Sequence, residues 1–586
     1  RYELIITTSG GLYRYCIGDI IEVISIKNKF PYIKFIERRG AVSDLFGEKL
    51  EESFLKNIMQ TYKQKVDFYM FAPSKNHYIL FIKTDKKISI EDLESKLRKN
   101  FHYDYCRKLG QLKEIKLFIL TGNPEKEYIE ACQNKNQKLG NIKMTALSKE
   151  SGWENIFNGS FGKSLHYAPL TLTTLAALIP ESLNAEAKIY DETIETIPLD
   201  LEADIIVMTS ITGTSQRCYA YADYFRKKGI TVVLGGVHPS LMPEEASQHA
   251  DVVMIGFAEQ TFPQMLLDFK SGNLKKIYLQ DKEFNLENKI IPRRELLQKD
   301  KYITTATVEV VRGCSLPCTF CAYPTAFGRK IYKRPIKEVL SEIEMFSEKI
   351  ILFPDVNLIA DREYAMRLFK EMKSLKKYWM GLVTSSVGID ENMIKTFADS
   401  GCKGLLIGFE SITQESQSYI NKGINKVAGY EELMKKLHDY GILVQGCFAF
   451  GSDEEDTSVF ERTVEAVVKA KIDLPRYSIL TPFPKTQFYA QLEAENRIFE
   501  KNWAMYDVEH CVFTPKKMTV EELEKGTAWA WRETYSMKNI FKRLAPFTHS
   551  PWISLPLNIA YRKYADKYEH FTKEIMCDNS DIPIID

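Results

Sequence analysis

The sequence has almost no net charge, because 79 lysine and arginine residues are offset by 78 aspartate and glutamate residues, leaving a formal charge of +1. Nucleic acids and anionic membranes select a basic excess, so this balance argues against both as general partners. The chain also lacks a signal peptide and any run of about 18 uncharged apolar residues that could span a bilayer. These absences predict a soluble protein without a transmembrane segment.

Cysteine is too sparse for a disulfide scaffold. The 11 cysteines are an odd number spread over 586 residues, which favours a reducing compartment. The exception is a C-x3-C-x2-C cluster formed by Cys314, Cys318 and Cys321 in VRGCSLPCTFCAYP. Three thiolates can each bind one iron of a 4Fe-4S cube, which leaves the fourth iron open for a substrate or a reactive cofactor. A zinc site that borrows Cys402 or a histidine, and a chance cluster, are the alternatives.

The length predicts several domains. From Val308 onward, six apolar runs alternate with amphipathic helical stretches, which predicts a partial (βα)6 barrel over residues 307–500. Reactive groups of such a barrel lie at the carboxyl ends of its strands. The cysteine cluster directly follows the first run, VEVVRG, and is expected at that face. Residues 501–586 predict a helical extension.

A second alternating unit precedes the barrel. Its expected strands AEAKIYDE, ADIIVMTS, TVVLGG and DVVMIGF predict a Rossmann-like doubly wound domain over residues 150–275, followed by a connector at 276–306. Small and polar residues stand at the ends of these strands, where a backbone can approach a ligand closely. They are Ser210, Thr212, Gly213, Thr214, Gly235, Gly236 and Gly256. Residues 1–145 predict a separate α+β domain.

The motif CSLPCTFC, with Phe320 before the last cysteine and at the end of a first barrel strand, resembles the radical S-adenosylmethionine superfamily over residues 300–500. This likeness implies that S-adenosylmethionine binds the fourth iron through its amino and carboxylate groups. It also implies cofactor contacts from strand-end residues, namely Phe320, Asp355, Asn357, Ser385, Glu410 and Ser411; ordinary caps are the alternative for each. TPFPKT resembles the family's TPFPGT turn, but Lys485 replaces the glycine, which argues against a left-handed backbone there.

The doubly wound unit resembles the cobalamin-binding domain of one large subclass of that superfamily, through SITGTS, LGGVHPSLMPEE and VVMIGFAEQTF. The D-x-H-x-x-G motif that supplies a histidine ligand to cobalt is absent. The likeness therefore implies cobalamin contacts near Val237 and His238 without histidine on the metal. Glu259 is the only acid left of the usual G-E-G-E. A Rossmann-like domain without a ligand is the alternative.

The N-terminal unit resembles the C-terminal part of the auxin-responsive acyl-acid amido synthetase family, through TTSGGLYRYCIGD, P-x3-F-x-E-R-R-G and GEKLEE. By this likeness Asp19 contacts the ribose of ATP, in a nucleotide site that is vestigial or partial because the larger nucleotide-binding portion is missing. The first residue, Arg1, predicts a fragment of a longer chain.

Together these likenesses predict a cobalamin-dependent radical enzyme with a 4Fe-4S cluster, most simply a methyltransferase acting at an unactivated carbon of a small-molecule or lipid-like substrate. A radical cyclase or rearrangement enzyme shares every motif, and a non-catalytic corrinoid and iron-sulfur module is a further alternative. This chemistry is expected to need an electron donor such as flavodoxin or ferredoxin, and to take place in an oxygen-poor cytoplasm.

Overall fold

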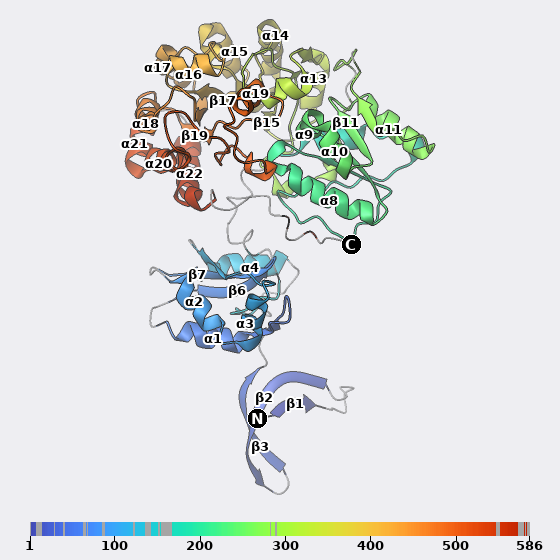
Figure 1. The fold of residues 1–586 in the computed structure, drawn as a ribbon, viewed down its shortest axis with the longest axis vertical. Coiled ribbons are helices and arrows are strands. Elements are labelled where there is room, and N and C mark those ends of the chain that lie inside the picture. Colours follow the sequence, from blue (N-terminus) through green and yellow to red (C-terminus); the bar gives the residue numbers. More distant parts are fainter. Residues whose placement is uncertain are drawn as a thin grey trace. The chain divides into compact units, whose positions relative to one another are not determined.

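The computed structural model describes residues 2–6, 15–27, 30–38, 42–62, 66, 68–84, 88–120, 124–134, 142–150, 153, 167–281, 283–287, 290–545, 551–571, 579 and 582. The chain divides into two compact units, residues 1–162 and 163–586 (Figure 1). Each described helix is too short or too polar to cross a membrane.

The first unit combines small sheets with helices, as the α+β prediction requires. One antiparallel sheet consists of β1 (Tyr2–Ile6), β2 (Tyr15–Lys27) and β3 (Phe30–Arg38). A second sheet has the order β6 (Phe68–Ser74), β7 (His77–Lys83) and β8 (Lys116–Ile119), and β4 (Val42–Ser43) pairs with β5 (Leu50–Glu51). The helices are α1 (Glu52–Gln60), α2 (Ile90–Leu97), α3 (Phe101–Lys108) and α4 (Pro124–Asn134).

The second unit begins with a four-stranded parallel sheet in the order β12-β11-β10-β9. Its strands are β9 (Ile205–Thr209), β10 (Thr231–Gly235), β11 (Val252–Ile255) and β12 (Ile277–Leu279). The helices are α7 (Leu170–Ala177), α8 (Ser215–Lys227), α9 (Val237–Leu241), α10 (Pro243–His249) and α11 (Thr261–Lys270). Continuous apolar runs such as Val232 to Leu234 are fully buried, as in a sheet covered on both faces.

Two details of this sheet differ from the sequence prediction. Residues 185–192, expected to form a strand, are not part of the sheet. Instead β12, which lies in the expected connector, pairs with β11 through Met254 opposite Tyr278. Tyr278 is buried and donates to Asp268 of α11 at 2.7 Å, so packing rather than apolar periodicity fixes this short strand.

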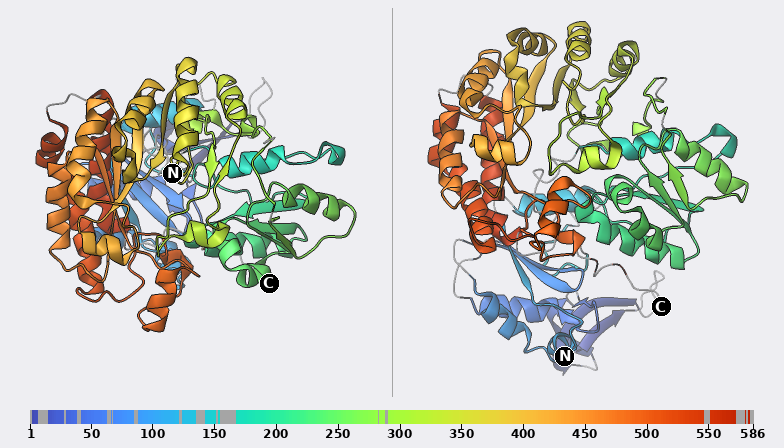
Figure 2. Two further views of the ribbon diagram at one scale, coloured as in Figure 1. Left: turned by 90° about the horizontal axis from the view of Figure 1, so that it is seen from above. Right: turned by 45° about the horizontal axis from the view of Figure 1, so that its top comes forward.

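The barrel contains a five-stranded parallel sheet in sequential order. Its strands are β15 (Ile350–Phe353), β16 (Tyr378–Val383), β17 (Cys402–Glu410), β18 (Leu443–Phe450) and β19 (Leu474–Ile479). Helices α13 (Ile336–Glu344), α14 (Arg362–Met372), α15 (Glu391–Asp399), α16 (Gln414–Tyr419), α17 (Tyr430–Asp439) and α18 (Val459–Lys469) lie around the outside of the strands (Figures 1 and 2).

The predicted first strand is much reduced. Only Thr307 bridges to Leu352 of β15, and the chain then forms the short strand β13 (Val311–Arg312), which pairs antiparallel with β14 (Tyr332–Lys333). The expected sixfold barrel therefore has five full strands, because the segment before the cysteines leaves the sheet.

Alternation along the strands separates two faces of the barrel sheet. Trp379, Ile407 and Phe448 are buried against the outer helices, and Trp379 stacks on Phe369 of α14 at 4.3 Å between ring centroids. Each large apolar side chain buried in this way contributes roughly 1.5–3 kcal/mol. Residues at alternate positions face the inside and keep partial exposure.

The last part of the chain is mostly helical, as predicted, with α19 (Gln487–Ala494), α20 (Val520–Thr534), α21 (Met537–Leu544) and α22 (Pro551–Phe571). Helix α20 packs beside β19, where the Trp531 indole donates to the carbonyl of Tyr477 at 3.1 Å. The turn before α19 contradicts one expectation, since Lys485 adopts a left-handed φ of 64°. The lysine therefore occupies the conformation for which the related motif uses glycine.

Candidate functional site

The three clustered cysteines lie in the cysteine loop, residues 313–321, which joins β13 to helix α12 (Ala322–Phe327). All three side chains are partly exposed. The loop is anchored through its backbone: Thr319 N–H donates to Ile420 at 3.1 Å, and Phe488 N–H of α19 donates to Thr319 at 3.0 Å.

Gly313 opens the cysteine loop with a φ of 116°. A Cβ at this position would collide with the backbone carbonyl of Lys330. Only glycine tolerates both the conformation and the contact.

The thiols have no single-ion geometry in this structure: among the described residues, no group of three histidine, cysteine or acidic side chains is arranged to hold one ion. A 4Fe-4S cube places each thiolate on a different iron, so convergence on one point is not required. Burial raises the pKa of Cys318 to about 11, while Lys422 lowers it and both Cys321 and Cys314 raise it. The three thiols therefore share one electrostatic environment.

A buried ion pair lies beside the cysteine loop at the end of β17. Lys422 contacts Glu410, and their side chains are 9% and 13% exposed. Burial lowers the pKa of Lys422, but Glu410 and Cys318 raise it more, so the lysine stays charged. The pair lies over Gly408, where a Cβ would collide with the Glu410 carboxylate and stand 2.7 Å from Lys422 Nζ. A positive charge next to the thiols favours their deprotonation, which iron binding requires.

Asp355 has a role that the sequence did not predict. Its buried carboxylate accepts the N–H groups of Val310, at 2.9 Å, and of Val311, the two residues that lead into the cysteine loop. Burial raises the pKa of Asp355 to about 7, with a further increase from Glu309. One side-chain oxygen, Oδ2, has no partner among the described residues. By accepting these two N–H groups, Asp355 holds the segment before the cysteine loop away from the barrel sheet.

The other predicted S-adenosylmethionine contacts are at the expected strand ends, but most are tied into local structure. Asn357 Oδ1 accepts the N–H of Ile359 at 3.3 Å. Ser411 is buried and donates to Glu455 at 3.0 Å, and Ser385 donates to Asn425 at 2.6 Å. Phe320 is partly buried against the barrel core. Glu410 is partly exposed and, after burial, is among the groups that raise the pKa of Cys318.

Glycines shape the carboxyl ends of β10 and β11, and this surface, with Gly235, Gly236, Val237, Gly256 and Glu259, is named the glycine edge. These five residues are partly exposed. Gly236 has a φ of 99° and Gly256 one of 85°. A Cβ on Gly236 would collide with the Thr209 hydroxyl, so only glycine lets the backbone here pack closely against the end of β9.

The remaining predicted cobalamin residues lie deeper. His238 is fully buried, 3.3 Å from the Thr212 hydroxyl through Nδ1 and 3.5 Å from Glu245 through Nε2. Trp503 covers this group and donates to Glu245 at 3.0 Å. His238 is therefore held inside the protein by these contacts.

The strand end after β9 is also covered. Ser210 is buried, and its hydroxyl has no partner among the described residues. Gly213 lies against the backbone of Tyr506, where a Cβ would be 3.1 Å from the carbonyl oxygen. Thr214 is exposed, and its hydroxyl donates to Ile211 at 3.2 Å.

The glycine edge and the cysteine loop are joined directly. Arg312 binds Glu259 at 2.7 Å and Glu309 at 2.6 Å, and its guanidinium lies 4.5 Å above the ring of Phe257. Phe257 also stacks on Phe327 of α12, 4.9 Å between centroids. Sequence reasoning missed this junction because its members are about 50 residues apart and belong to two domains.

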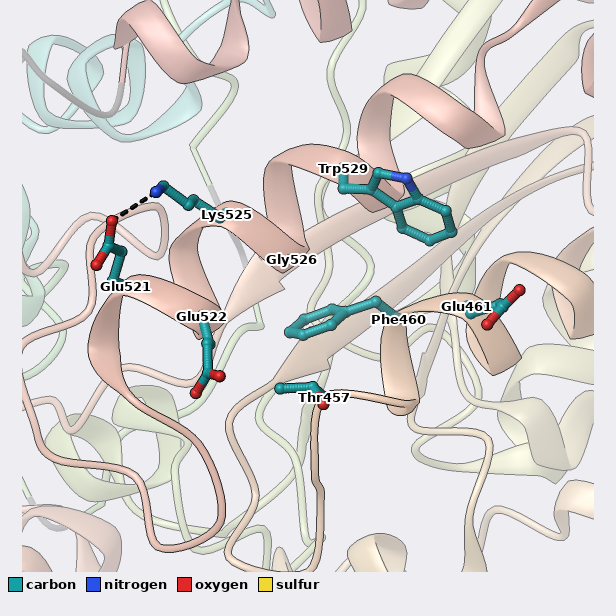
Figure 3. Close-up of a pocket in the computed structure, with 8 residues that line it drawn as sticks. All are labelled: Thr457, Phe460, Glu461, Glu521, Glu522, Lys525, Gly526 and Trp529. Atoms are coloured by element: carbon teal, nitrogen blue, oxygen red, sulfur yellow. Dashed lines mark hydrogen bonds and ion pairs between the residues drawn. The ribbon is translucent and has the colours of Figure 1, made fainter.

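Two further features lie away from this junction. A hollow on the outer side of the barrel, between α18 and α20, contains none of the predicted site residues (Figure 3). It is lined by Thr457, Phe460, Glu461, Glu521, Glu522, Lys525, Gly526 and Trp529. In the first unit, Asp19 pairs with Arg38 between β2 and β3, but its side chain is outside the described part of the structure.

Family models match three segments of the chain. The radical SAM superfamily model covers residues 308–467, and the B12 binding domain model covers residues 167–266. A model of the GH3 family central domain covers residues 1–38. This last match is shorter than the predicted N-terminal domain and is described as the central rather than the C-terminal part of its family.

The chain is similar to two proteins of Chlorobaculum tepidum. It is 29% identical to bacteriochlorophyllide d C-12(1)-methyltransferase over 64% of this chain and 84% of the relative. It is 28% identical to bacteriochlorophyllide d C-8(2)-methyltransferase over 67% of this chain and 91% of the relative. Among solved structures, the cobalamin-dependent S-adenosylmethionine radical enzyme OxsB with aqua-cobalamin bound shares the fold, with a TM-score of 0.52 and 14% identity over 71% of this chain and 72% of that chain.

Proposed function

Because this chain joins a B12-binding domain to a radical SAM domain, we propose that it is a cobalamin-dependent radical S-adenosylmethionine methyltransferase that methylates an unactivated carbon of a small molecule. One observation carries the proposal. The glycine edge and the cysteine loop meet at Arg312, so a corrin at the glycine edge and a cluster in the cysteine loop would lie close to each other.

The chain's own residues hold and separate these groups. Cys314, Cys318 and Cys321 would each bind one iron, and Lys422 keeps a positive charge beside Cys318. Asp355 positions the segment that enters the cysteine loop. When bound, the cluster, S-adenosylmethionine and cobalamin supply the electron, the radical and the methyl group, and the protein orients them and excludes water.

The glycine edge would receive the corrin through backbone rather than through a histidine. Gly236 and Gly256 are partly exposed and carry no side chain, and His238 already contacts Thr212 and Glu245. We assign the S-adenosylmethionine contacts to the open iron and to Glu410, with Asn357, Ser385 and Ser411 shaping the strand ends around it. The domain limits 150–275 and 307–500, a flavodoxin or ferredoxin as electron donor, and a cytoplasmic location complete the proposal.

Cofactor content tests the proposal before any substrate is known. The native chain, reconstituted anaerobically with iron, sulfide and hydroxocobalamin, should bind about four irons and one cobalt. Cys318→Ala should lose the iron and keep the cobalt. Cys402→Ala is the matched control, because this buried cysteine on β17 is the fourth ligand in the zinc alternative. Retention of iron by Cys402→Ala supports the cluster, whereas failure of the native chain to bind cobalt contradicts methyl transfer.

Product analysis then separates the enzyme classes. The two Chlorobaculum relatives are named for bacteriochlorophyllide d, which makes this compound the first substrate to assay. A methyltransferase yields 5'-deoxyadenosine, S-adenosylhomocysteine and a product heavier by one methylene unit. A cyclase or rearrangement enzyme yields no S-adenosylhomocysteine, and a non-catalytic module yields none of the three.

A further inference from the structure

An arginine on the inner face of the barrel has no partner of its own. Arg476 is at the middle of β19, and its side chain is exposed. No hydrogen bond or ion pair joins it to another described residue. Its exposed guanidinium can therefore donate hydrogen bonds to a ligand or to water.

The strand register places Arg476 on the same face as the cysteine loop. Arg476 pairs with Cys447 of β18, and Cys447 pairs with Gly408 of β17. Gly408 lies under Glu410 and Lys422, the pair beside Cys318. Adjacent strands are about 4.8 Å apart, so the backbone of Arg476 lies roughly 10 Å from that of Gly408. The pKa of Cys447 agrees with this order, since burial raises it to about 11 and Glu410 raises it further, while Arg476 and Lys422 lower it.

The surroundings of Arg476 combine aromatic surface with polar groups. Gln445, two residues before Cys447 on the same face of β18, donates to the Tyr561 hydroxyl of α22 at 3.1 Å. Tyr561 and Tyr564 both influence the pKa of Arg476. Tyrosine rings with a nearby guanidinium suit a flat, apolar ligand that carries one negative group.

The nearby carboxyl group is not a counter-ion. Glu509 is within electrostatic range of Arg476 without forming an ion pair. Its Oε1 accepts the hydroxyl of Tyr564 at 2.6 Å, and its buried Oε2 has no partner among the described residues. Burial raises the pKa of Glu509. Its Oε2 is thus a second polar atom in this region without a partner among the described residues.

We propose that Arg476 binds a carboxylate of the substrate and so holds the reacting carbon two strands away, beside Glu410, Lys422 and Cys318. This inference rests on the proposed function and adds to it a substrate class, a carboxylic acid with an apolar or aromatic body. Arginine and a carboxylate form two parallel charge-assisted hydrogen bonds, which fix orientation as well as affinity.

Benzoate is a suitable probe because it combines one carboxylate with one ring, and benzamide is its neutral counterpart. The full chain, reconstituted with iron, sulfide and hydroxocobalamin, is treated with p-hydroxyphenylglyoxal, and the modified arginines are identified by peptide mass spectrometry. Saturating benzoate should slow the modification of Arg476 at least about fivefold relative to sodium chloride of equal ionic strength. Benzamide should not protect Arg476, and benzoate should not protect Arg462, an exposed arginine on the outer helix α18. The proposal is overturned if benzoate, benzamide and sodium chloride protect Arg476 equally, or if none of them protects it.

Direct binding gives a second readout that a change in folding does not mimic. Equilibrium dialysis with labelled benzoate should show a Kd at least about tenfold higher for Arg476→Met, which corresponds to about 1.4 kcal/mol. Arg462→Met should bind like the native chain. Circular dichroism checks that both variants are folded, and equal affinities in all three proteins contradict the assignment.

These measurements need neither reduction nor turnover. A chain that binds benzoate through Arg476 but forms no S-adenosylhomocysteine with bacteriochlorophyllide d or any other acid contradicts the proposed function alone. A chain that methylates a substrate with unchanged KM after Arg476→Met contradicts this inference alone.

Discussion

The glycine edge and the cysteine loop meet at Arg312 but are built by different means. At the glycine edge, the backbone of Gly236 packs against Thr209 and that of Gly256 against Gln280, so closely that neither position has room for a Cβ. The cysteine loop is instead held by charged side chains, namely the buried carboxylate of Asp355 and the ion pair between Glu410 and Lys422. The difference predicts that different substitutions disrupt the two regions. Adding a Cβ should disrupt the glycine edge, and removing a charge should disrupt the region of the cysteine loop.

The largest effect is expected where the two meet. Arg312→Met leaves Glu259 and Glu309 without their partner in a region where the arginine is 12% exposed. Removing one member of a buried ionic group typically costs about 3–5 kcal/mol. Urea unfolding measures this loss. The matched control is Arg293→Met, which breaks an exposed pair with Glu295 and should cost less than about 1 kcal/mol.

The pH dependence of Asp355 tests the side-chain half of the comparison. Its pKa rises from 3.8 to about 7 in the folded chain. Below pH about 4 the carboxyl is protonated in both states, and it has no effect on stability. As the pH rises toward 7, the unfolded chain releases this proton first, so stability is lost, up to about 4 kcal/mol.

Asp355→Asn isolates that effect. The amide oxygen can still accept the N–H groups of Val310 and Val311, but it does not titrate. The difference in unfolding free energy between variant and native chain should grow in favour of the variant from pH 4 to pH 7. A constant difference over this range would show that Asp355 keeps an ordinary pKa.

The backbone half of the comparison is tested at the glycine edge. Gly236 combines a φ of 99° with a ψ of −165°, a region that essentially only glycine occupies. Gly236→Ala should lose about 1–3 kcal/mol of stability and most of the bound cobalt, while the iron content stays unchanged. Gly229→Ala is the control, since that glycine also has a positive φ but a Cβ there meets nothing within 4 Å. Equal cobalt loss in both variants points to general destabilisation.

The smallest effect is expected at the turn that supports the cysteine loop. Lys485 has a φ of 64°, a conformation that is unfavourable for a residue with a Cβ. Lys485→Gly removes that strain but increases the freedom of the unfolded chain, so the net gain should be about 0.5–1 kcal/mol. Lys485→Ala keeps the strain and should leave the unfolding free energy nearly unchanged.

Much of the architecture could be predicted because it depends on local patterns. Apolar runs such as those of β10 and β18 alternate with amphipathic helices, and this alternation predicts parallel sheets. The spacing of Cys314, Cys318 and Cys321 predicts an iron-sulfur site because all three ligands lie in one loop. The missed details were those that packing decides, namely the pairing of β12 and the departure of Val311 from the barrel sheet.

The sequence by itself indicated the cofactors, because the cysteine spacing predicts an iron-sulfur site and short motifs carry the resemblance that implies S-adenosylmethionine and cobalamin. Only the tertiary structure decided what those segments meet. Glu259 and Arg312 are too far apart in sequence for any pattern to connect them. The burial of His238 also depends on Trp503, which comes much later in the chain and covers its group. The position of Arg476 opposite Cys447 likewise follows from strand register, which long-range pairing sets and local composition does not.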